Sequence, residues 1–232
     1  MYISWMSSQQ PGVFLRIAHR GASAYEPENT LRSFRKAVEL GADMIEFDVR
    51  MSLDGRLVII HDSSVNRTTN GKGAVRMKSL GELKDLDAGM GERIPTLEET
   101  VESVAGRTKL VIELKEDGLE ERVIKVIKEF GVANDVFIVS FKPVRLKAVK
   151  EIEPGLKTGL ILFASVDPLK AAGKCGADAV APFRWFITRR LAEKTREAGM
   201  HLFTWTVDEK ERAERLRLMG VSGIVTNRPD LL

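Results

Sequence analysis

The stretch Ile45-Glu46-Phe47-Asp48-Val49 places two carboxylates inside an apolar run, and Val111-Ile112-Glu113-Leu114-Lys115 repeats the pattern. Short, continuous apolar runs are typical of strands in a parallel sheet that is covered on both faces. Side chains two positions apart in a strand share a face, so Glu46 and Asp48 point the same way. A buried carboxylate is costly unless it is paired, protonated or bound to a cation. The two runs therefore predict strands that carry acids toward a common centre.

Further apolar runs alternate with amphipathic runs along the rest of the chain. The helix-like segments between them mostly end at Gly, as the run 30–40 does before Gly41. Repeated units of strand, helix and strand imply right-handed crossovers. The chain has 232 residues, a length that α/β barrels commonly reach as one domain. We therefore predict an α/β protein, a (β/α)8 barrel whose single domain spans 1–232. The strand candidates are Arg16–Gly21, Met44–Val49, Leu57–Asp62, Leu110–Lys115, Val136–Phe141, Lys157–Leu162, Ala179–Phe183, Leu202–Val207 and Gly223–Asn227.

Three segments depart from this rhythm. Nine strand candidates are one more than the barrel needs, and the turn signal at Ser52–Gly55 is too short for a crossover helix. The glycine-rich stretch 63–94 is interpreted as an insertion on the top of the barrel, with a short helix near 80–86. Residues 1–12 are expected to form a loosely docked tail.

The acidic and histidine side chains gather where a parallel barrel places its active site. That place is the carboxyl end of the strands. The residues at or near such ends are His19, Glu46, Asp48, His61, Glu113 and Lys115. Three carboxylates facing one centre would form an oxygen cage for a hard divalent cation. The remaining histidine, His201, precedes a strand and lies at the opposite end, so we interpret it as structural.

Composition excludes several classes of protein. A net charge of +3 is too small for a concentrated nucleic-acid-binding face, although it suits an anionic small molecule. The single cysteine, Cys175, excludes an internal disulfide and favours a reducing compartment, so we expect a cytoplasmic protein with a buried thiol. No apolar run approaches eighteen residues, and the start of the chain lacks the features of a signal peptide, so no stable membrane insertion is expected. The oligomeric state stays open.

Nine ordered motifs resemble those of the glycerophosphodiester phosphodiesterase family, from about residue 16 to the end of the chain. They include Ala18-His19-Arg20-Gly21, Pro27-Glu28-Asn29-Thr30, Glu46-x-Asp48, Asp54-Gly55, His61-Asp62, the run 66–73, Glu113-x-Lys115, Trp205-Thr206-Val207 and Thr226-Asn227-Arg228-Pro229-Asp230. The resemblance implies a TIM barrel with a small inserted cap after the His-Asp strand. It also implies metal-dependent hydrolysis of glycerophosphodiesters to sn-glycerol 3-phosphate and an alcohol.

The resemblance assigns a metal site to Glu46, Asp48 and Glu113. Its ion would be one divalent cation, Mg²⁺ or Ca²⁺, with Mn²⁺ as a further candidate. The alternative is that these acids are only salt-bridged barrel residues, for instance Glu113 with Lys115. Three converging acids without a cation would raise at least one pKa sharply, which favours the metal.

Catalytic roles are implied for the two histidines of the motifs. His19 and His61 would act as general base and general acid, in that order by analogy. The base would activate the glycerol 2-hydroxyl and form a cyclic phosphate that water then opens. Direct attack by water is the competing route.

Other motif residues are expected to contact the substrate, each with an alternative. Arg20 and Lys115 would bind the phosphate oxygens, although Lys115 could also neutralise Glu113. Glu28 opens the first helix beside the site and is a candidate pocket residue. Asn29 or Thr30 is expected to cap the N-terminus of that helix, and Asn29 is a candidate for this cap rather than for a substrate contact. Trp205 is expected either to wall the glycerol or head-group pocket or to pack in the barrel interior.

Two positions depart from the family pattern. Asp208 stands where Asn usually follows Trp-Thr-Val, and Asn227 stands where Thr-Asp-Arg-Pro is usual. Both exchanges are expected to change charge at the pocket rim and so the head-group preference. Four aromatic residues could line an apolar head-group pocket, although an ordinary core position is the more conservative interpretation. They are Phe163, Phe183, Trp185 and Phe186.

Rival functions remain open. The nearest is a lysophospholipase D-type phosphodiesterase acting on lyso-phospholipids, which would need an apolar groove; Trp5 and Trp185 are compatible with one. A non-catalytic phosphodiester- or metal-binding barrel would be expected to lack a histidine or a carboxylate, and none is missing. A nucleic-acid binder has no support beyond the basic isoelectric point.

Overall fold

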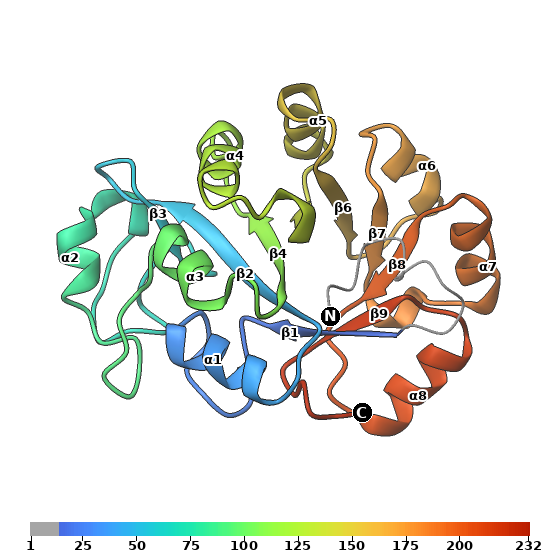
Figure 1. Ribbon diagram of the computed structural model, residues 1–232, viewed down its shortest axis with the longest axis horizontal. Coiled ribbons are helices and arrows are strands. Elements are labelled where there is room, and N and C mark those ends of the chain that lie inside the picture. The colour runs from blue at the N-terminus through green and yellow to red at the C-terminus, as the bar shows by residue number, and fades with distance from the viewer. Residues whose placement is uncertain (1–13) are drawn as a thin grey trace.

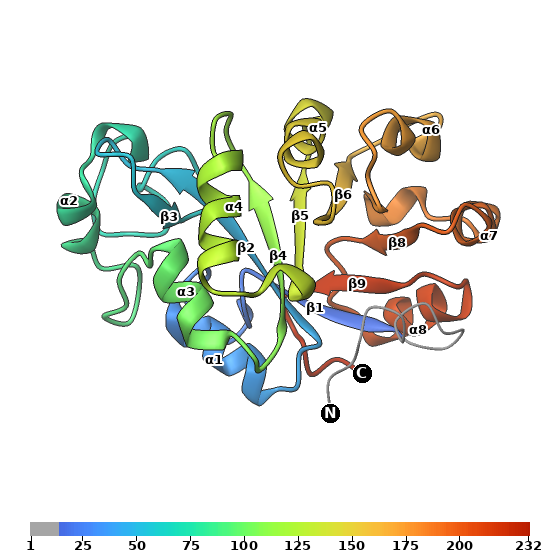
Figure 2. The same ribbon diagram turned by 45° about the horizontal axis from the view of Figure 1, so that its top comes forward.

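The computed structural model describes residues 14–232, and the predicted tail, with Trp5, lies outside them. Eight parallel strands close into a barrel, because β1 pairs with β9 on one side and with β2 on the other. Helices surround the strands (Figures 1 and 2). The barrel strands are β1 (Leu15–His19), β2 (Met44–Met51), β4 (Lys109–Leu114), β5 (Val136–Ser140), β6 (Lys157–Leu162), β7 (Ala179–Pro182), β8 (His201–Thr204) and β9 (Gly223–Thr226). The predicted (β/α)8 barrel is confirmed.

The ninth strand candidate is an antiparallel extension and not a barrel strand. β3 (Leu57–Ile59) pairs with the end of β2, with Met51 opposite Leu57. The connecting turn is closed by hydrogen bonds from Ser52 N to Arg56 O (2.9 Å) and from Gly55 N to Ser52 O (3.0 Å). Gly55 has a φ of +75°, which glycine adopts without steric cost. The short turn therefore makes a hairpin, as its length requires.

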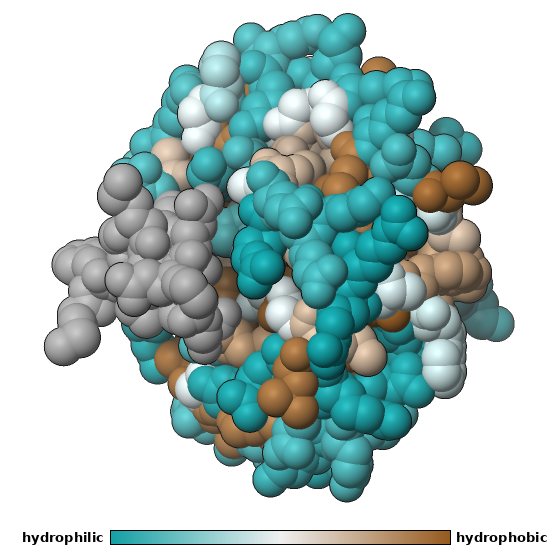
Figure 3. Space-filling model, turned by 90° about the vertical axis from the view of Figure 1, so that its right-hand side faces the viewer, coloured by the Kyte–Doolittle hydropathy of each residue, from teal (hydrophilic) through white to brown (hydrophobic). Residues whose placement is uncertain are grey.

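The first outer helix begins and ends close to the predicted run 30–40, and further helices follow the barrel strands from β2 to β8. The outer helices are α1 (Leu31–Glu39), α3 (Leu97–Val104), α4 (Glu120–Glu129), α5 (Pro143–Ile152), α6 (Pro168–Gly173), α7 (Arg189–Glu197) and α8 (Lys210–Leu218). Thr30 and Thr96 each start a helix with a capping box. The face on the side of α6 and α7 is mostly hydrophilic, with separated hydrophobic patches (Figure 3). These helices thus bury one stripe and leave the other in water.

The stretch 63–94 connects β3 to α3 at the left of Figure 1. It contains a short 3₁₀ helix, η2 (Val75–Met77), and α2 (Leu80–Lys84). Its buried side chains form a small cluster with Val58 and Ile60 from the β3 region. Two more 3₁₀ turns, η3 (Ala133–Asp135) and η4 (Arg184–Phe186), lie elsewhere in the chain.

Alternation along β2 decides which side chains enter the barrel. Ile45, Phe47 and Val49 pack in the layer between strands and helices, whereas Met44 packs with Val111 in the barrel interior. Because side chains alternate along a strand, the acids that share a face with Met44 point inward. No helix among residues 14–232 is long and apolar enough to cross a membrane.

Candidate active site

The strand register brings the predicted acids together. Glu46 lies opposite His19 in the pairing of β1 with β2, and Asp48 lies opposite Glu113 in the pairing of β2 with β4. Glu46, Asp48 and Glu113 are buried, and each offers an oxygen that lies within 4.8 Å of the other two. Residues far apart in the sequence thus meet at the carboxyl end of the barrel.

These carboxylates are in electrostatic conflict. Burial, followed by repulsion from Asp48 and Glu113, raises the pKa of Glu46 well above its ordinary value. Burial and the charge of Asp48 raise the pKa of Glu113 to about 7. Burial alone would also raise the pKa of Asp48, but Lys115 and Arg20 outweigh it and lower that pKa. A cation among the three would relieve the repulsion.

The donor set fits a hard divalent cation. Carboxylate oxygens are the ligands that Mg²⁺ and Ca²⁺ prefer. Oδ1 of Asp48 is buried without a hydrogen bond, although Nζ of Lys115 lies 3.3 Å away as an ion-pair partner. A buried carboxylate oxygen without a hydrogen bond is the kind of group that a metal ion satisfies.

Arg20 adopts an uncommon backbone conformation that holds Glu46. Its φ is +55°, and its backbone N–H donates to Oε2 of Glu46 at 2.9 Å. Its guanidinium donates to Oε1 of Glu28 at 2.8 Å and lies 3.4 Å from Oδ2 of Asp48. Lys115 lies 2.8 Å from Oε1 of Glu113 and 3.3 Å from Asp48. Both cationic side chains therefore offset part of the negative charge of the acids.

A second network orients His61. Nδ1 of His61 lies 2.7 Å from Oδ1 of Asp62, and Arg67 donates to both oxygens of Asp62 at 2.8 and 3.1 Å. Arg67 also donates to both oxygens of Glu28, at 2.7 and 2.8 Å. Hydrogen bonds from Arg67, followed by one from His61, outweigh burial and lower the pKa of Asp62. Because a carboxylate only accepts, the proton of His61 sits on Nδ1.

His19 has a neutral partner instead. Nδ1 of His19 lies 2.7 Å from Oδ1 of Asn227, which directly follows β9. Asn227 in turn donates from Nδ2 to Oδ2 of Asp208 at 2.7 Å. Burial, then the nearby charge of Arg20, lowers the pKa of His19. Burial also lowers the pKa of His61.

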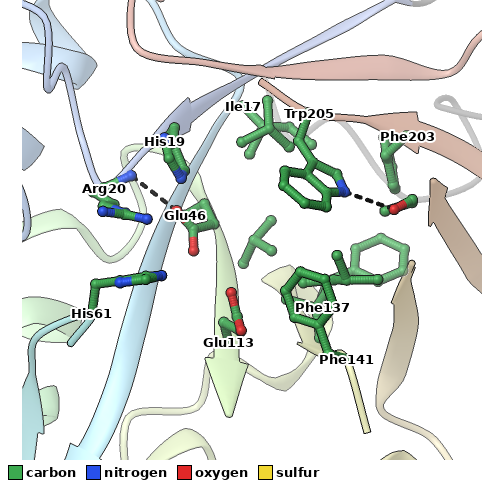
Figure 4. A pocket seen from close by; sticks show the side chains of 15 residues that line it. Ile17, His19, Arg20, Glu46, His61, Glu113, Phe137, Phe141, Phe203 and Trp205 are labelled. Atoms are coloured by element: carbon green, nitrogen blue, oxygen red, sulfur yellow. Dashed lines mark hydrogen bonds between the residues drawn. The ribbon is translucent and has the colours of Figure 1, made fainter. Parts of the chain in front are cut away.

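The two imidazoles and two of the acids open onto one cavity of about 120 Å³ (Figure 4). One side of it is polar, with His19, His61, Glu46 and Glu113 pointing inward. The opposite side is apolar, and Trp205 stands there with its indole N–H donating to Ala181 O at 2.8 Å. The apolar lining is Ile17, Val111, Phe137, Val139, Phe141, Ile161, Ala181, Phe203, Trp205 and Val225.

Three more predicted residues contact one of the acids or a residue that lines the cavity. The N-cap of α1 is Thr30, and the side chain of Asn29 donates to Oδ2 of Asp48 at 2.8 Å. Asn29 therefore supports the acids and caps no helix. Among the described residues that line the cavity, Glu28 and Lys115 are absent, because their charged groups are turned toward ion-pair partners.

Asp208 and Asn227, expected at the pocket rim, contact each other, and Asn227 also contacts His19. Neither is among the described residues that line the cavity. The reciprocal exchange of Asn and Asp at these two positions was a sequence signal for this contact, although it was interpreted only as a change of charge at the rim. The link from Asp62 through Arg67 to Glu28 was missed as well, although Asp62 directly follows His61.

The conservative interpretation of the aromatic residues as core is wrong for three of the four. Phe163, Trp185 and Phe186 are exposed, and Phe183 is half-buried. His201 is buried at the amino end of β8 in contact with the rings of Phe137 and Phe203, and it is not among the described residues that line the cavity. Cys175 is buried, as expected.

Comparisons with known proteins agree with this geometry. The model of the glycerophosphoryl diester phosphodiesterase family matches residues 19–231. A glycerophosphodiester phosphodiesterase of Caldanaerobacter subterraneus is 45% identical, covering 94% of this chain and 96% of that protein. A glycerophosphodiester phosphodiesterase of Bacillus subtilis is 33% identical, covering 95% of this chain and 86% of that protein.

Solved structures show the same architecture. An Oleispira antarctica phosphodiesterase in complex with the product sn-glycerol-3-phosphate superposes with a TM-score of 0.86 at 30% identity, covering 94% of each chain. The glycerophosphodiester phosphodiesterase of Agrobacterium tumefaciens gives a TM-score of 0.87 at 30% identity, covering 94% of this chain and 98% of that one. With its barrel, its acids and its histidines in these positions, the chain belongs to the glycerophosphoryl diester phosphodiesterase family.

Proposed function

We propose that this protein hydrolyses glycerophosphodiesters to sn-glycerol 3-phosphate and an alcohol with the help of one divalent cation. The observation that carries the proposal is the convergence of three buried carboxylates and two imidazoles at the carboxyl end of the barrel. The product complex of the Oleispira antarctica phosphodiesterase supports the choice of substrate. Family membership alone would leave the reaction open, because function depends on the site.

Glu46, Asp48 and Glu113 would hold the cation. When bound, it supplies positive charge for the phosphoryl oxygens and lowers the pKa of the attacking hydroxyl. Arg20, which lines the cavity, and Lys115, which lies beside Glu113, add positive charge for the phosphate. Trp205 and the apolar side chains around it exclude water from the opposite side.

The hydrogen-bond partners of the histidines support different roles. The carboxylate of Asp62 stabilises a protonated His61, which suits a general acid for the leaving alkoxide. The neutral amide of Asn227 leaves Nε2 of His19 to accept a proton, which suits a general base. His19 would take the proton of the glycerol 2-hydroxyl, giving a cyclic phosphate that water opens with the roles reversed.

Attack by water on the diester is the alternative route, with His19 taking the proton of that water. A substrate without the 2-hydroxyl distinguishes the two routes. Unreduced turnover of the deoxy diester would exclude the cyclic phosphate, whereas loss of turnover with retained binding would support it.

A panel of substrates and metals tests the function itself. Glycerophosphocholine and glycerophosphoethanolamine are each incubated with Mg²⁺, Ca²⁺ or Mn²⁺, and released sn-glycerol 3-phosphate is measured. We expect release with at least one metal, loss of release after chelation, and recovery when the metal is returned. Release that survives exhaustive chelation would remove the metal from the proposal.

A second candidate function is hydrolysis of lyso-phospholipids, and an exposed row of aromatic rings favours it. Phe141 and Trp205, both in the cavity wall, meet edge to face with ring centroids 5.5 Å apart. Phe183 contacts Trp205 at 5.1 Å and stacks on Phe163 at 5.0 Å, and Phe186 follows at 6.4 Å from Phe163. Phe163 is 62% exposed. The row offers an apolar path from the cavity to the surface, along which one acyl chain could lie.

Comparison of glycerophosphocholine with lysophosphatidylcholine below its micelle concentration tests this candidate. The two diesters share a head group and differ by one acyl chain. Phe163→Ser should lower kcat/KM for the lyso-lipid about tenfold, the loss expected from about 1.4 kcal/mol of apolar contact. It should leave glycerophosphocholine unchanged, because Phe163 does not line the cavity among the described residues. Equal effects on both substrates would exclude a chain-binding role for the row.

A further inference from the structure

A chain of hydrogen bonds connects Asp208 with the ring of His19 through the side chain of Asn227. Oδ1 of Asn227 lies 2.7 Å from Nδ1 of His19, and Nδ2 of Asn227 donates to Oδ2 of Asp208 at 2.7 Å. Oδ1 of Asp208 accepts from the backbone N–H of Asn227 at 2.8 Å and from Oγ1 of Thr226 at 3.0 Å. Asp208 is therefore held by both the backbone and the side chains that follow β9.

The chemistry of Asp208 decides how Asn227 is turned. An ionised carboxylate only accepts hydrogen bonds, so the amide nitrogen of Asn227 has to face it. The amide oxygen then faces His19. Oγ of Ser23 lies 2.8 Å from the same amide oxygen and 2.8 Å from the backbone oxygen of His19, so its single proton can go to either, and Ser23 tolerates both orientations of the amide. The reversed amide is disfavoured at Asp208, where it would put two acceptor oxygens next to each other.

The direction of the amide decides the tautomer of His19. An acceptor in front of Nδ1 requires the ring proton to sit on Nδ1. A neutral imidazole carries only one such proton, so Nε2 keeps a lone pair. Because His19 lines the cavity, that lone pair is available to a proton donor there.

We propose that Asp208 and Asn227 are positioning residues that hold His19 in the tautomer able to act as a base. The inference rests on the proposed function, in which His19 is that base. Neither residue is among the described residues that line the cavity, so each acts through the ring of His19. The arrangement also keeps the negative charge one side chain away from His19, whereas Asp62 contacts His61 directly.

The isosteric change Asp208→Asn tests the proposal. Oδ1 of the new amide can still accept from the backbone N–H of Asn227, but its N–H₂ group then faces the side chain of Asn227. Asn227 is expected to turn its oxygen toward that group and its nitrogen toward His19. The ring would then accept at Nδ1 and carry its proton on Nε2. We expect kcat to fall about 10- to 100-fold with little change in KM.

The double exchange Asp208→Asn with Asn227→Asp is the matched rescue. A carboxylate at 227 can accept from His19, from Ser23 and from the new amide at 208, so every hydrogen bond of the chain is restored. The single change Asn227→Asp instead places two carboxylates against each other. We expect the double variant to be at least tenfold more active than either single variant.

The ring tautomer gives a readout that does not depend on activity. In protein with ¹⁵N-labelled histidine, two-bond ¹⁵N–¹H correlations report which ring nitrogen carries the proton, and His19→Gln assigns the signals. We expect Nδ1–H in the wild type and in the double variant, and Nε2–H in Asp208→Asn. Asp230→Asn is the control, since Asp230 accepts from the Tyr25 hydroxyl and touches no part of this chain of bonds.

Each outcome bears on the proposal. An Nε2–H tautomer in the wild type, unchanged kcat and tautomer in Asp208→Asn, or a double variant no better than the singles would overturn it. If wild-type protein hydrolyses no glycerophosphodiester, the proposed function fails, while the tautomer experiment still decides whether Asp208 and Asn227 orient the ring.

Discussion

At the amino end of the barrel, Asp178 accepts hydrogen bonds from Lys150 (2.8 Å), Lys157 (3.2 Å) and the Thr158 N–H (2.8 Å). At the carboxyl end, three acids face one another. Burial alone would raise the pKa of Asp178, but its partners, Lys150 first, lower it. Burial and repulsion raise the pKa values of Glu46 and Glu113.

The opposite pKa shifts distinguish a carboxylate that stabilises the barrel, Asp178, from the carboxylates of the candidate active site. A paired carboxylate with a lowered pKa adds to the free energy of unfolding at neutral pH. Buried repulsion between carboxylates subtracts from it, and a cation bound among them would relieve that cost. The histidines divide in the same way, since His201 packs against two phenylalanine rings at the amino end, whereas His19 and His61 open onto the cavity.

The largest expected effect concerns the histidines at the two ends. His19→Ala and His61→Ala should each lower kcat by a factor on the order of 10²–10⁴, because each removes a group that we propose transfers a proton. His201→Gln is the control from the other end and should lower the melting temperature without changing kcat of the folded enzyme. Steady-state kinetics with circular dichroism as a folding check make the measurement. Near-normal kcat in either cavity variant would remove that histidine from the mechanism.

A smaller effect is expected from relieving the repulsion among the acids. In the wild type, a divalent metal at 100 times its Kd should add about 2.7 kcal/mol to the free energy of unfolding. That gain corresponds to a melting temperature higher by about 5–10 °C for a domain of this size. Glu46→Gln should lose most of the gain and melt slightly higher than the wild type in chelator. Thermal melts with and without metal check this, with Asp117→Asn, an exposed acid that pairs with Arg145, as the control.

An unchanged metal response in Glu46→Gln would show that the cation binds elsewhere. Equal melting temperatures of variant and wild type in chelator would show that the repulsion at Glu46 is already relieved in the metal-free protein. The two measurements are independent. The first compares one protein with and without metal, and the second compares the variant with the wild type in chelator.

The barrel could be predicted from the sequence because its signals are local. Apolar strand runs, glycines after helices and the capping box at Thr96 each depend on a few neighbouring residues. The sequence showed one strand candidate more than the barrel needs, near Leu57, but it did not show that this strand runs antiparallel to its neighbour. Its antiparallel pairing follows from the turn at Gly55, which leaves no room for a crossover.

The same distinction, between local sequence patterns and contacts between distant segments, applies to the candidate site. Glu46, Asp48 and Glu113 could be placed because alternation and parallel register are regular. The partners of the histidines could not, because hydrogen bonds between Asn227 and Asp208, or between Arg67 and Glu28, join segments whose spacing carries no pattern. Exposure of Phe163 was missed for a related reason, since a loop aromatic has no periodicity to show whether a neighbouring ring covers it.

The smallest expected effect is on the free energy of unfolding at low pH, and it concerns Asp178 at the amino end of the barrel. Because the pKa of Asp178 is lower in the folded protein, its contribution is present above its ordinary pKa of about 3.9 and is lost as the pH falls through the folded value. Asp178→Asn should therefore cost about 1–2 kcal/mol at pH 7, and the difference from the wild type should shrink below about pH 4. Urea unfolding between pH 2 and 7 measures it, with Asp117→Asn as the exposed control. A difference that stays constant with pH would mean that Asp178 contributes through packing and not through its charge, and the contrast between the two ends would then rest on the carboxyl-end acids alone.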